Sequence, residues 1–177
     1  MFDRILRAIR LDPTVYREIA EDEGAMSQAA IIVVIVTLLS AIGSSIVADN
    51  FFLSLVVRWI TGIVIGWILW AILTYFVGTR LFGGRSSVPE MMRVLGFASA
   101  PQLLGIFGII PCLGWIAALI GAILSFIAGF IAVRESMEFD TGKAILTVLI
   151  SWVISFAITF AVGLLTAPAT VSGVLGG

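Results

Sequence analysis

Residues 94–133 decide the fold: VLGFASAPQL LGIFGIIPCL GWIAALIGAI LSFIAGFIAV, forty residues without one charged side chain. A transmembrane α-helix needs about 20 consecutive apolar residues, so this stretch is too long for one span and long enough for two. Pro111 and Gly114 near its middle favour a turn. The sequence therefore predicts two spans, 94–110 and 113–133, joined by a tight connection.

Three further charge-free windows follow the same pattern, at residues 28–48, 59–77 and 144–166. The composition agrees, since 60% of the residues are hydrophobic and 12% are charged. The mean hydropathy is +1.18. These values are far from those of soluble proteins. We expect an all-α fold, a polytopic integral membrane bundle of five transmembrane helices at about 28–48, 57–77, 94–110, 113–133 and 144–166. An N-terminal segment (1–26) precedes the membrane domain (27–166), and a short external tail (167–177) follows it.

The basic residues predict how the chain is threaded. Lysine and arginine near span ends are retained on the cytoplasmic face. Nine of the ten lysines and arginines lie in alternate gaps between the apolar windows: Arg4, Arg7, Arg10, Arg17, Arg80, Arg85, Arg93, Arg134 and Lys143. Only Arg58 falls on the other side. We therefore expect the N-terminus and the loops 78–93 and 134–143 to be cytoplasmic and the C-terminus external. A full hairpin and a re-entrant dip at 94–133 both satisfy this charge pattern, so that alternative stays open.

The first nine residues have the pattern of a helix that lies in the plane of the lipid headgroups. Apolar and basic side chains occupy opposite sides of this helix: Phe2, Ile5, Leu6 and Ile9 on one, Arg4, Arg7 and Arg10 on the other. One interpretation is that the three arginines bind anionic lipid headgroups. An equally open alternative is a helix that packs on the protein's own loops. Asp12, followed by Pro13, is typical of the cap of a second short helix.

Small residues spaced four apart line one face of several predicted spans. They are Gly62 and Gly66 in the second span, Ala117, Gly121, Ser125 and Gly129 in the fourth, and Thr147, Ser151, Ser155, Thr159 and Gly163 in the fifth. Small residues let helices approach closely in lipid, so we interpret these faces mainly as helix-packing surfaces. The alternative for the fifth-span hydroxyls is a polar path for a solute. The glycines of the second span allow a homo-oligomer without requiring one.

The third predicted span is short and contains Pro101 and Gln102. Proline predicts a kink that frees a carbonyl near residue 97. Broken helices near the bilayer middle are where transporters build substrate sites, and Gln102 offers an amide for one. A kinked helix whose glutamine bonds a neighbouring helix is the interpretation we favour. Intramembrane Asp, Glu, Lys and His are the usual marks of ion or proton coupling, and none of them lies within these windows.

Enzymatic chemistry finds little support in the sequence. The chain has no histidine and a single cysteine, Cys112. The usual general base and metal ligand are therefore missing, and the serines have no base beside them. We expect no catalytic residue, metal or cofactor. A net charge of −1, with basic groups split among three loops, does not indicate a nucleic-acid partner.

Three motifs stand out in order along the chain: Asp12-Pro13 before an aromatic and an acidic stretch, GFASAP at 96–101 and IPCLG at 110–114. Together with the five predicted spans, they resemble the Yip family of Ypt/Rab-interacting membrane proteins. The resemblance runs from about Leu11 to Leu165. It implies five spans and a cytoplasmic N-terminus. Eukaryotic members bind prenylated small GTPases and assist vesicle formation. Their Asp-Leu-Tyr-Gly-Pro motif and long hydrophilic N-terminal region are absent here, so the chain is more similar to short bacterial and archaeal relatives. This similarity implies a prokaryotic cytoplasmic membrane. GTPase binding is not carried over.

The sequence therefore predicts a non-enzymatic membrane organiser or adaptor. Its cytoplasmic face, formed by residues 2–9, 78–93 and 134–143, would meet membrane lipids or a protein partner. The alternative is a small-solute transporter or channel, with a path near Gln102 and the hydroxyls of the fifth span.

Overall fold

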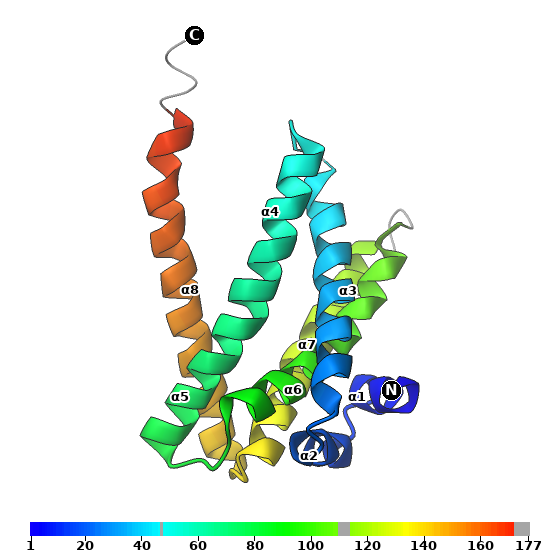
Figure 1. Ribbon diagram of the computed structural model, residues 1–177, viewed down its shortest axis with the longest axis vertical. Coiled ribbons are helices and arrows are strands. Elements are labelled where there is room, and N and C mark those ends of the chain that lie inside the picture. The colour runs from blue at the N-terminus through cyan, green and yellow to red at the C-terminus, as the bar shows by residue number, and fades with distance from the viewer. Residues whose placement is uncertain (47, 110–113, 172–177) are drawn as a thin grey trace.

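The structure, a computed structural model, describes residues 1–46, 48–109 and 114–171, and these form helices joined by short turns (Figure 1). Four helices in these ranges are long and apolar enough to cross a membrane: Ala25–Ser45, Phe51–Phe82, Ile116–Ser136 and Thr141–Ala161. The predicted all-helical membrane architecture is therefore confirmed at this level.

The elements follow one another in a simple order. Two short helices, α1 (Phe2–Ile9) and α2 (Pro13–Glu21), precede α3 (Ala25–Ser45). The next long helix has three parts, α4 (Phe51–Ile63), a π-helical segment η1 (Val64–Leu69) and α5 (Trp70–Phe82). Then come α6 (Val88–Ala98), a 3₁₀ segment η2 (Ala100–Ile109), α7 (Gly114–Ser136) and α8 (Thr141–Val171).

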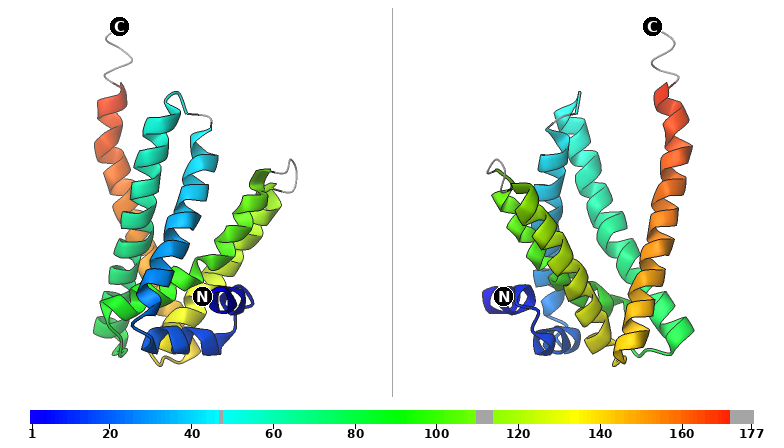
Figure 2. Two further views of the ribbon diagram at one scale, coloured as in Figure 1. Left: turned by 45° about the vertical axis from the view of Figure 1, so that its right-hand side comes forward. Right: turned by 180° about the vertical axis from the view of Figure 1, so that it is seen from behind.

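The elements gather at one end of the molecule and spread apart toward the other. Figures 1 and 2 show α1, α2, the end of α5, α6, the end of α7 and the start of α8 together at the bottom, which we call the basal end. The connection between α3 and α4 lies at the opposite, distal end. From their bases, α4 and α8 diverge toward the distal end (Figure 1). The nine basic residues other than Arg58 lie on the elements and connections of the basal end.

Local sequence signals explain where the basal helices begin and end. Asp12 caps α2, because its carboxylate accepts a hydrogen bond from the Thr14 amide at 2.9 Å, and Pro13 is the first helical residue, as the sequence predicts. Ser87 and Glu90 form a reciprocal capping box at the start of α6. Gly83 ends α5 with a φ of 70°, a left-handed conformation that glycine adopts without strain.

The third predicted span is not one continuous α-helix. Residues 94–98 complete α6, Ser99 ends that helix, and η2 continues from Ala100 as a 3₁₀ helix packed against α7. The physical reason is Pro101, which has no amide proton to continue the α-helical pattern. This interruption explains why 94–110 is absent from the four long apolar helices. The predicted turn at 110–113, with Pro111 and Cys112, lies outside the described residues.

Close backbone contacts hold the central helices together. An added Cβ at Gly96 of α6 would lie 2.7 Å from the Cβ of Ala29 in α3. An added Cβ at Gly121 of α7 would lie 2.9 Å from the carbonyl oxygen of Pro101. Both distances are too short for any side chain larger than hydrogen. These glycines therefore set the spacing of α3, α6, η2 and α7.

Candidate functional site

The basal end carries a surface that we call the basal face, formed by α1, α2 and residues 83–87 and 137–140. Its N-terminal part is held by ion pairs between α1 and α2. Arg4 lies 2.8 Å from Glu18 and 2.6 Å from Asp22, and Arg7 lies 2.8 Å from Glu18 and 3.0 Å from Asp12. The two short helices thus form one unit.

These ion pairs shift the titration of the acidic side chains. Hydrogen bonds from Arg7 and then Arg4 hold the pKa of Glu18 below its ordinary value. Hydrogen bonds from Arg4 and from the Gly24 amide lower the pKa of Asp22 in the same way. The carboxylates therefore stay ionised well into the acidic range, and the pairs persist with them.

A buried arginine fixes the α1–α2 unit to the membrane helices. Arg93 of α6 is only 8% exposed. Its Nε donates to the carbonyl oxygen of Ile19 at 3.3 Å, and its Nη2 donates to that of Ala20 at 2.5 Å. These two carbonyls belong to the last turn of α2, where carbonyl groups have no hydrogen-bond partner within the helix. The same turn carries the negative end of the helix dipole. Arg93 therefore caps α2 from a different helix.

Two further contacts of α2 complete this attachment, one with α1 and one with α7. Tyr16 is fully buried and its hydroxyl donates to the carbonyl of Ala8 at 3.1 Å, which ties α2 back to α1. Burial raises the pKa of the Tyr16 phenol far above its ordinary value. Arg17 of α2 forms an ion pair with Glu135 at the end of α7, at a distance of 2.6 Å. The N-terminal unit is thus held on α6 and α7 together.

The two remaining loops of the basal face meet through an aromatic contact. Phe139 packs edge-on against Phe82, with ring centroids 6.4 Å apart. An added Cβ at Gly84 would lie 2.5 Å from the Phe139 ring, so a larger residue at this position would displace that ring. The connection after α5 and the connection after α7 therefore form one continuous surface.

The arginines predicted to bind headgroups have different surroundings. Arg4 and Arg7 face the acidic residues of α2, whereas Arg10, just after α1, is exposed and takes part in none of the ion pairs of the described residues. Phe2 is 73% exposed and Leu6 is 39% exposed on α1, and α1 also packs against η2. The internal pairing matches the alternative in which the helix packs on the protein itself, and lipid binding by the arginines stays a prediction.

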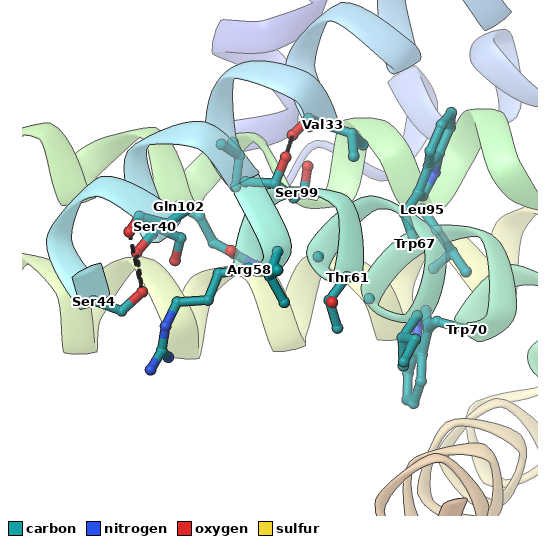
Figure 3. Close-up of a pocket in the computed structure, with 17 residues that line it drawn as sticks. Val33, Ser40, Ser44, Arg58, Thr61, Trp67, Trp70, Leu95, Ser99 and Gln102 are labelled. Carbon is teal, nitrogen blue, oxygen red and sulfur yellow. Dashed lines mark hydrogen bonds between the residues drawn. The ribbon is translucent and has the colours of Figure 1, made fainter. Parts of the chain in front are cut away.

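A second candidate site is a cleft of about 710 Å³ between α3, α4, η1 and the junction of α6 with η2. Arg58 lies at one end of this cleft and Trp67 and Trp70 at the other (Figure 3). Gln102 lines the cleft and two smaller adjoining cavities, of about 320 and 400 Å³. Gly66 has no neighbouring atom within 4 Å of an added Cβ, so it opens the cleft and does not pack against a helix.

Gln102 and Ser125 meet at the junction of η2 with α7. The side-chain amide of Gln102 donates to Ser125 Oγ at 3.0 Å, and Ser125 in turn donates to the carbonyl of Ala98 at 2.7 Å. The carbonyl freed by the proline is therefore that of Ala98, one residue from the predicted position, and a hydroxyl from α7 satisfies it. Pro101 is buried beside Gly121. These four predicted residues form one interhelical junction.

The hydroxyl stripe of α8 divides into two halves. Thr147 and Ser151 are fully buried where α8 packs on α5. Ser155 and Thr159 line a cavity of about 260 Å³ beside Gly66 and Trp70. Of the other predicted glycines, Gly62 abuts Thr37 of α3, with an added Cβ 3.2 Å from that side chain, and Gly129 faces Leu95 of α6. Most of the predicted small residues thus lie at helix contacts.

Sequence reasoning missed two positions that organise the basal end. Arg93 was interpreted only as a topology-determining charge, although its place six residues inside α6 is a signal that it lies on the helix and not in a loop. The contact between Gly78 of α5 and Met137 was also missed, because Gly78 lies one residue beyond the predicted span 57–77 and Trp70 interrupts the four-residue run of small residues.

Comparison with known proteins identifies one family. No curated protein and no solved structure matches the chain. The model of the Yip1 domain matches residues 8–163, which extend from α1 into α8. This range includes the basal face from Ala8 onward, the Gln102–Ser125 junction and the cleft. The match confirms the resemblance found in the sequence. Since the match covers most of its length, the chain is a membrane protein that belongs to the Yip1 domain family.

Proposed function

We propose that the protein is a non-enzymatic membrane organiser or adaptor that presents the basal face to a partner in the cytoplasm. The observation that carries this proposal is the attachment of the α1–α2 unit to α6 by Arg93, which is buried and donates to two carbonyls of α2. A segment held in this way forms a stable surface with the two adjoining loops. Preorganised surfaces bind with a smaller entropic cost than flexible ones.

The threading proposed with this function has five crossings, a cytoplasmic N-terminus and an external C-terminus. Two features support it: nine of the ten basic residues lie at the basal end, and η2 packs along α7 in the manner of a hairpin. The only thiol of the chain, Cys112, lies between these two elements in sequence. A membrane-impermeant maleimide should label Cys112 from outside intact cells. Labelling only in inside-out vesicles would contradict this topology.

Site-specific photocrosslinking in cells tests the adaptor function. The probe replaces Glu21 of α2 or Glu138 of the 137–140 loop, because both side chains are exposed. A probe at Val153, which is 59% exposed on α8 within the apolar region, serves as the control for lipid contact. We expect protein adducts from Glu21 and Glu138 but not from Val153. Adducts with lipid alone, or with a second copy alone, from all three positions would refute the adaptor function.

A transporter or channel is the second candidate, because Gln102 lines three adjoining cavities and Ser155 lines a fourth. Solute flux through proteoliposomes, abolished when a bulky side chain replaces Gln102 or Ser155, would favour it. Two observations weigh against it. Thr147 and Ser151 are buried against α5, and the Gln102 amide is already engaged with Ser125.

A further inference from the structure

We propose that the cleft beside Arg58 binds one anionic phospholipid, with its phosphate at Arg58 and an acyl chain along the cleft toward Trp70. This site differs from the basal face and does not depend on a cytoplasmic partner. Its evidence is the lining of the cleft, the position of its one cation and its length.

The polar groups that line the cleft are mostly satisfied within the protein. Each of the following donates to a protein oxygen at 2.7 to 3.0 Å: Thr37 to Val33, Ser44 to Ser40, Ser99 to Gly96, Trp67 to Met92 and Gln102 to Ser125. The remaining lining is largely aliphatic, with Val36, Val57, Ile65 and Leu95. A surface whose hydroxyls and amides are already paired gains little from a polar solute but readily contacts a hydrocarbon chain.

Arg58 supplies the one formal charge of the cleft. Its Nε donates to Ser54 Oγ at 3.0 Å, and Ser54 Oγ also accepts from the buried Ser45 hydroxyl at 3.1 Å. None of the ion pairs among residues 1–46, 48–109 and 114–171 involves Arg58. The serine contact thus orients the guanidinium and leaves its two terminal nitrogens for an anion. Guanidinium groups bind phosphate oxygens in a bidentate manner.

The length of the cleft matches one leaflet. Arg58 and Trp70 are twelve residues apart along α4, η1 and α5, which is at most about 18 Å at the α-helical rise of 1.5 Å per residue, since the π-helical segment rises less. Half of a hydrocarbon core of about 30 Å is roughly 15 Å. Figure 3 shows the guanidinium at one end of the cleft and the indole rings of Trp67 and Trp70 at the other. A phosphate at Arg58 therefore places the end of an acyl chain near these tryptophans.

Fluorescence quenching by brominated lipid tests the proposal directly. Trp59, Trp115 and Trp152 are replaced by phenylalanine in the full chain, which leaves Trp67 and Trp70 as reporters. Vesicles contain 80% phosphatidylcholine and 20% phosphatidylglycerol, and bromine is placed either on the phosphatidylglycerol or on an equal amount of the phosphatidylcholine. Unselective contact with bulk lipid gives equal quenching. Both lipids carry a phosphate, but the choline cation of phosphatidylcholine neutralises its charge. We therefore expect phosphatidylglycerol to associate about fivefold more strongly, the preference that one arginine near an anionic lipid surface produces.

Matched variants separate the headgroup from the acyl chain. Arg58→Gln should abolish the fivefold preference, and Arg58→Lys should retain most of it. Arg80 is an exposed arginine at the basal end, so Arg80→Gln should leave the preference unchanged. Gly66→Phe fills the cleft without a backbone clash, because no atom lies within 4 Å of an added Cβ. It should lower quenching by both lipids, and Val64→Phe, at an exposed position on the same segment, should not. Equal quenching by the two lipids in the reporter protein, or a preference that survives Arg58→Gln, would overturn the proposal.

Discussion

Replacement of Arg93 by methionine tests whether the basal face is a fixed structure. Methionine retains most of the apolar stem but removes both donors, so the carbonyls of Ile19 and Ala20 lose their partners in a site that is nearly closed to water. A hydrogen bond from a charged donor contributes about 1.5–3 kcal/mol, and the 3.3 Å bond is the weaker of the two. We expect the α1–α2 unit to be destabilised by about 3 kcal/mol, roughly a hundredfold in its docking equilibrium.

Hydrogen–deuterium exchange in lipid nanodiscs measures this change locally. Amides of residues 14–21 should exchange about a hundredfold faster in Arg93→Met, while those of α3 and α8 keep their protection. Arg85→Met is the matched control, because it removes one exposed positive charge from the same end of the molecule. Unchanged exchange in α2 would show that Arg93 does not hold the unit. Loss of protection throughout the bundle would show that Arg93 supports the whole fold and not this attachment alone.

Three further predictions concern other contacts. The Arg7 hydrogen bond lowers the pKa of Glu18 below its ordinary 4.5. The stabilisation of the α1–α2 unit by this hydrogen bond is therefore complete above about pH 4.5 and is lost as the pH falls through the lower native value. The exchange of α1, corrected for intrinsic rates, should rise only in that range. Glu18→Gln should weaken this dependence, and the rest should remain because Asp12 and Asp22 also have lowered pKa values. Gly121→Ala should lower the free energy of unfolding in detergent by about 1–3 kcal/mol, because the added Cβ meets a backbone carbonyl. Gly66→Ala, the control, should change it by less than about 1 kcal/mol. Equal effects of the two substitutions would contradict the close approach at Gly121. Thr147 is buried, and its hydroxyl has no partner among the described residues. Thr147→Val should therefore leave the free energy of unfolding within about 0.5 kcal/mol or raise it. A loss above about 2 kcal/mol would indicate a bound partner at that hydroxyl.

The sequence was most informative where the signal is local. Charge-free windows predicted the apolar helices, Asp12 with Pro13 predicted the start of α2, and Pro101 predicted the interruption before η2. The capping and proline signals act within one or two helical turns, and each window is a single uninterrupted run of sequence. The windows did not predict that Ser99 would end an α-helix and that a 3₁₀ segment would follow, since proline allows either a kinked α-helix or a change of helix type.

The basal face depended on contacts between residues far apart in sequence. Arg4 pairs with residues 14 and 18 positions later, and Arg93 reaches carbonyls more than 70 positions earlier. Hydrophobic periodicity predicts which side of a helix is polar but not which charges meet across helices. The sequence therefore identified Arg4 and Arg7 as one polar side of α1 and left their partner, lipid or protein, open.

The hydroxyl face of α8 shows how one regular repeat can have two different surroundings. The hydroxyls of α8 repeat every four residues, yet Thr147 and Ser151 pack on α5 whereas Ser155 and Thr159 line a cavity. The difference arises because α4 and α8 diverge above α5 (Figure 1), beyond the π-helical segment η1 that contains Gly66. One residue type at one spacing therefore seals the bundle near its base and borders open space farther along. The lipid proposed at Arg58 occupies a different space, the cleft between α3, α4 and η1, and Gly66 borders both this cleft and the cavity beside α8. A bulky side chain at position 66 therefore tests whether the space around η1 holds a ligand.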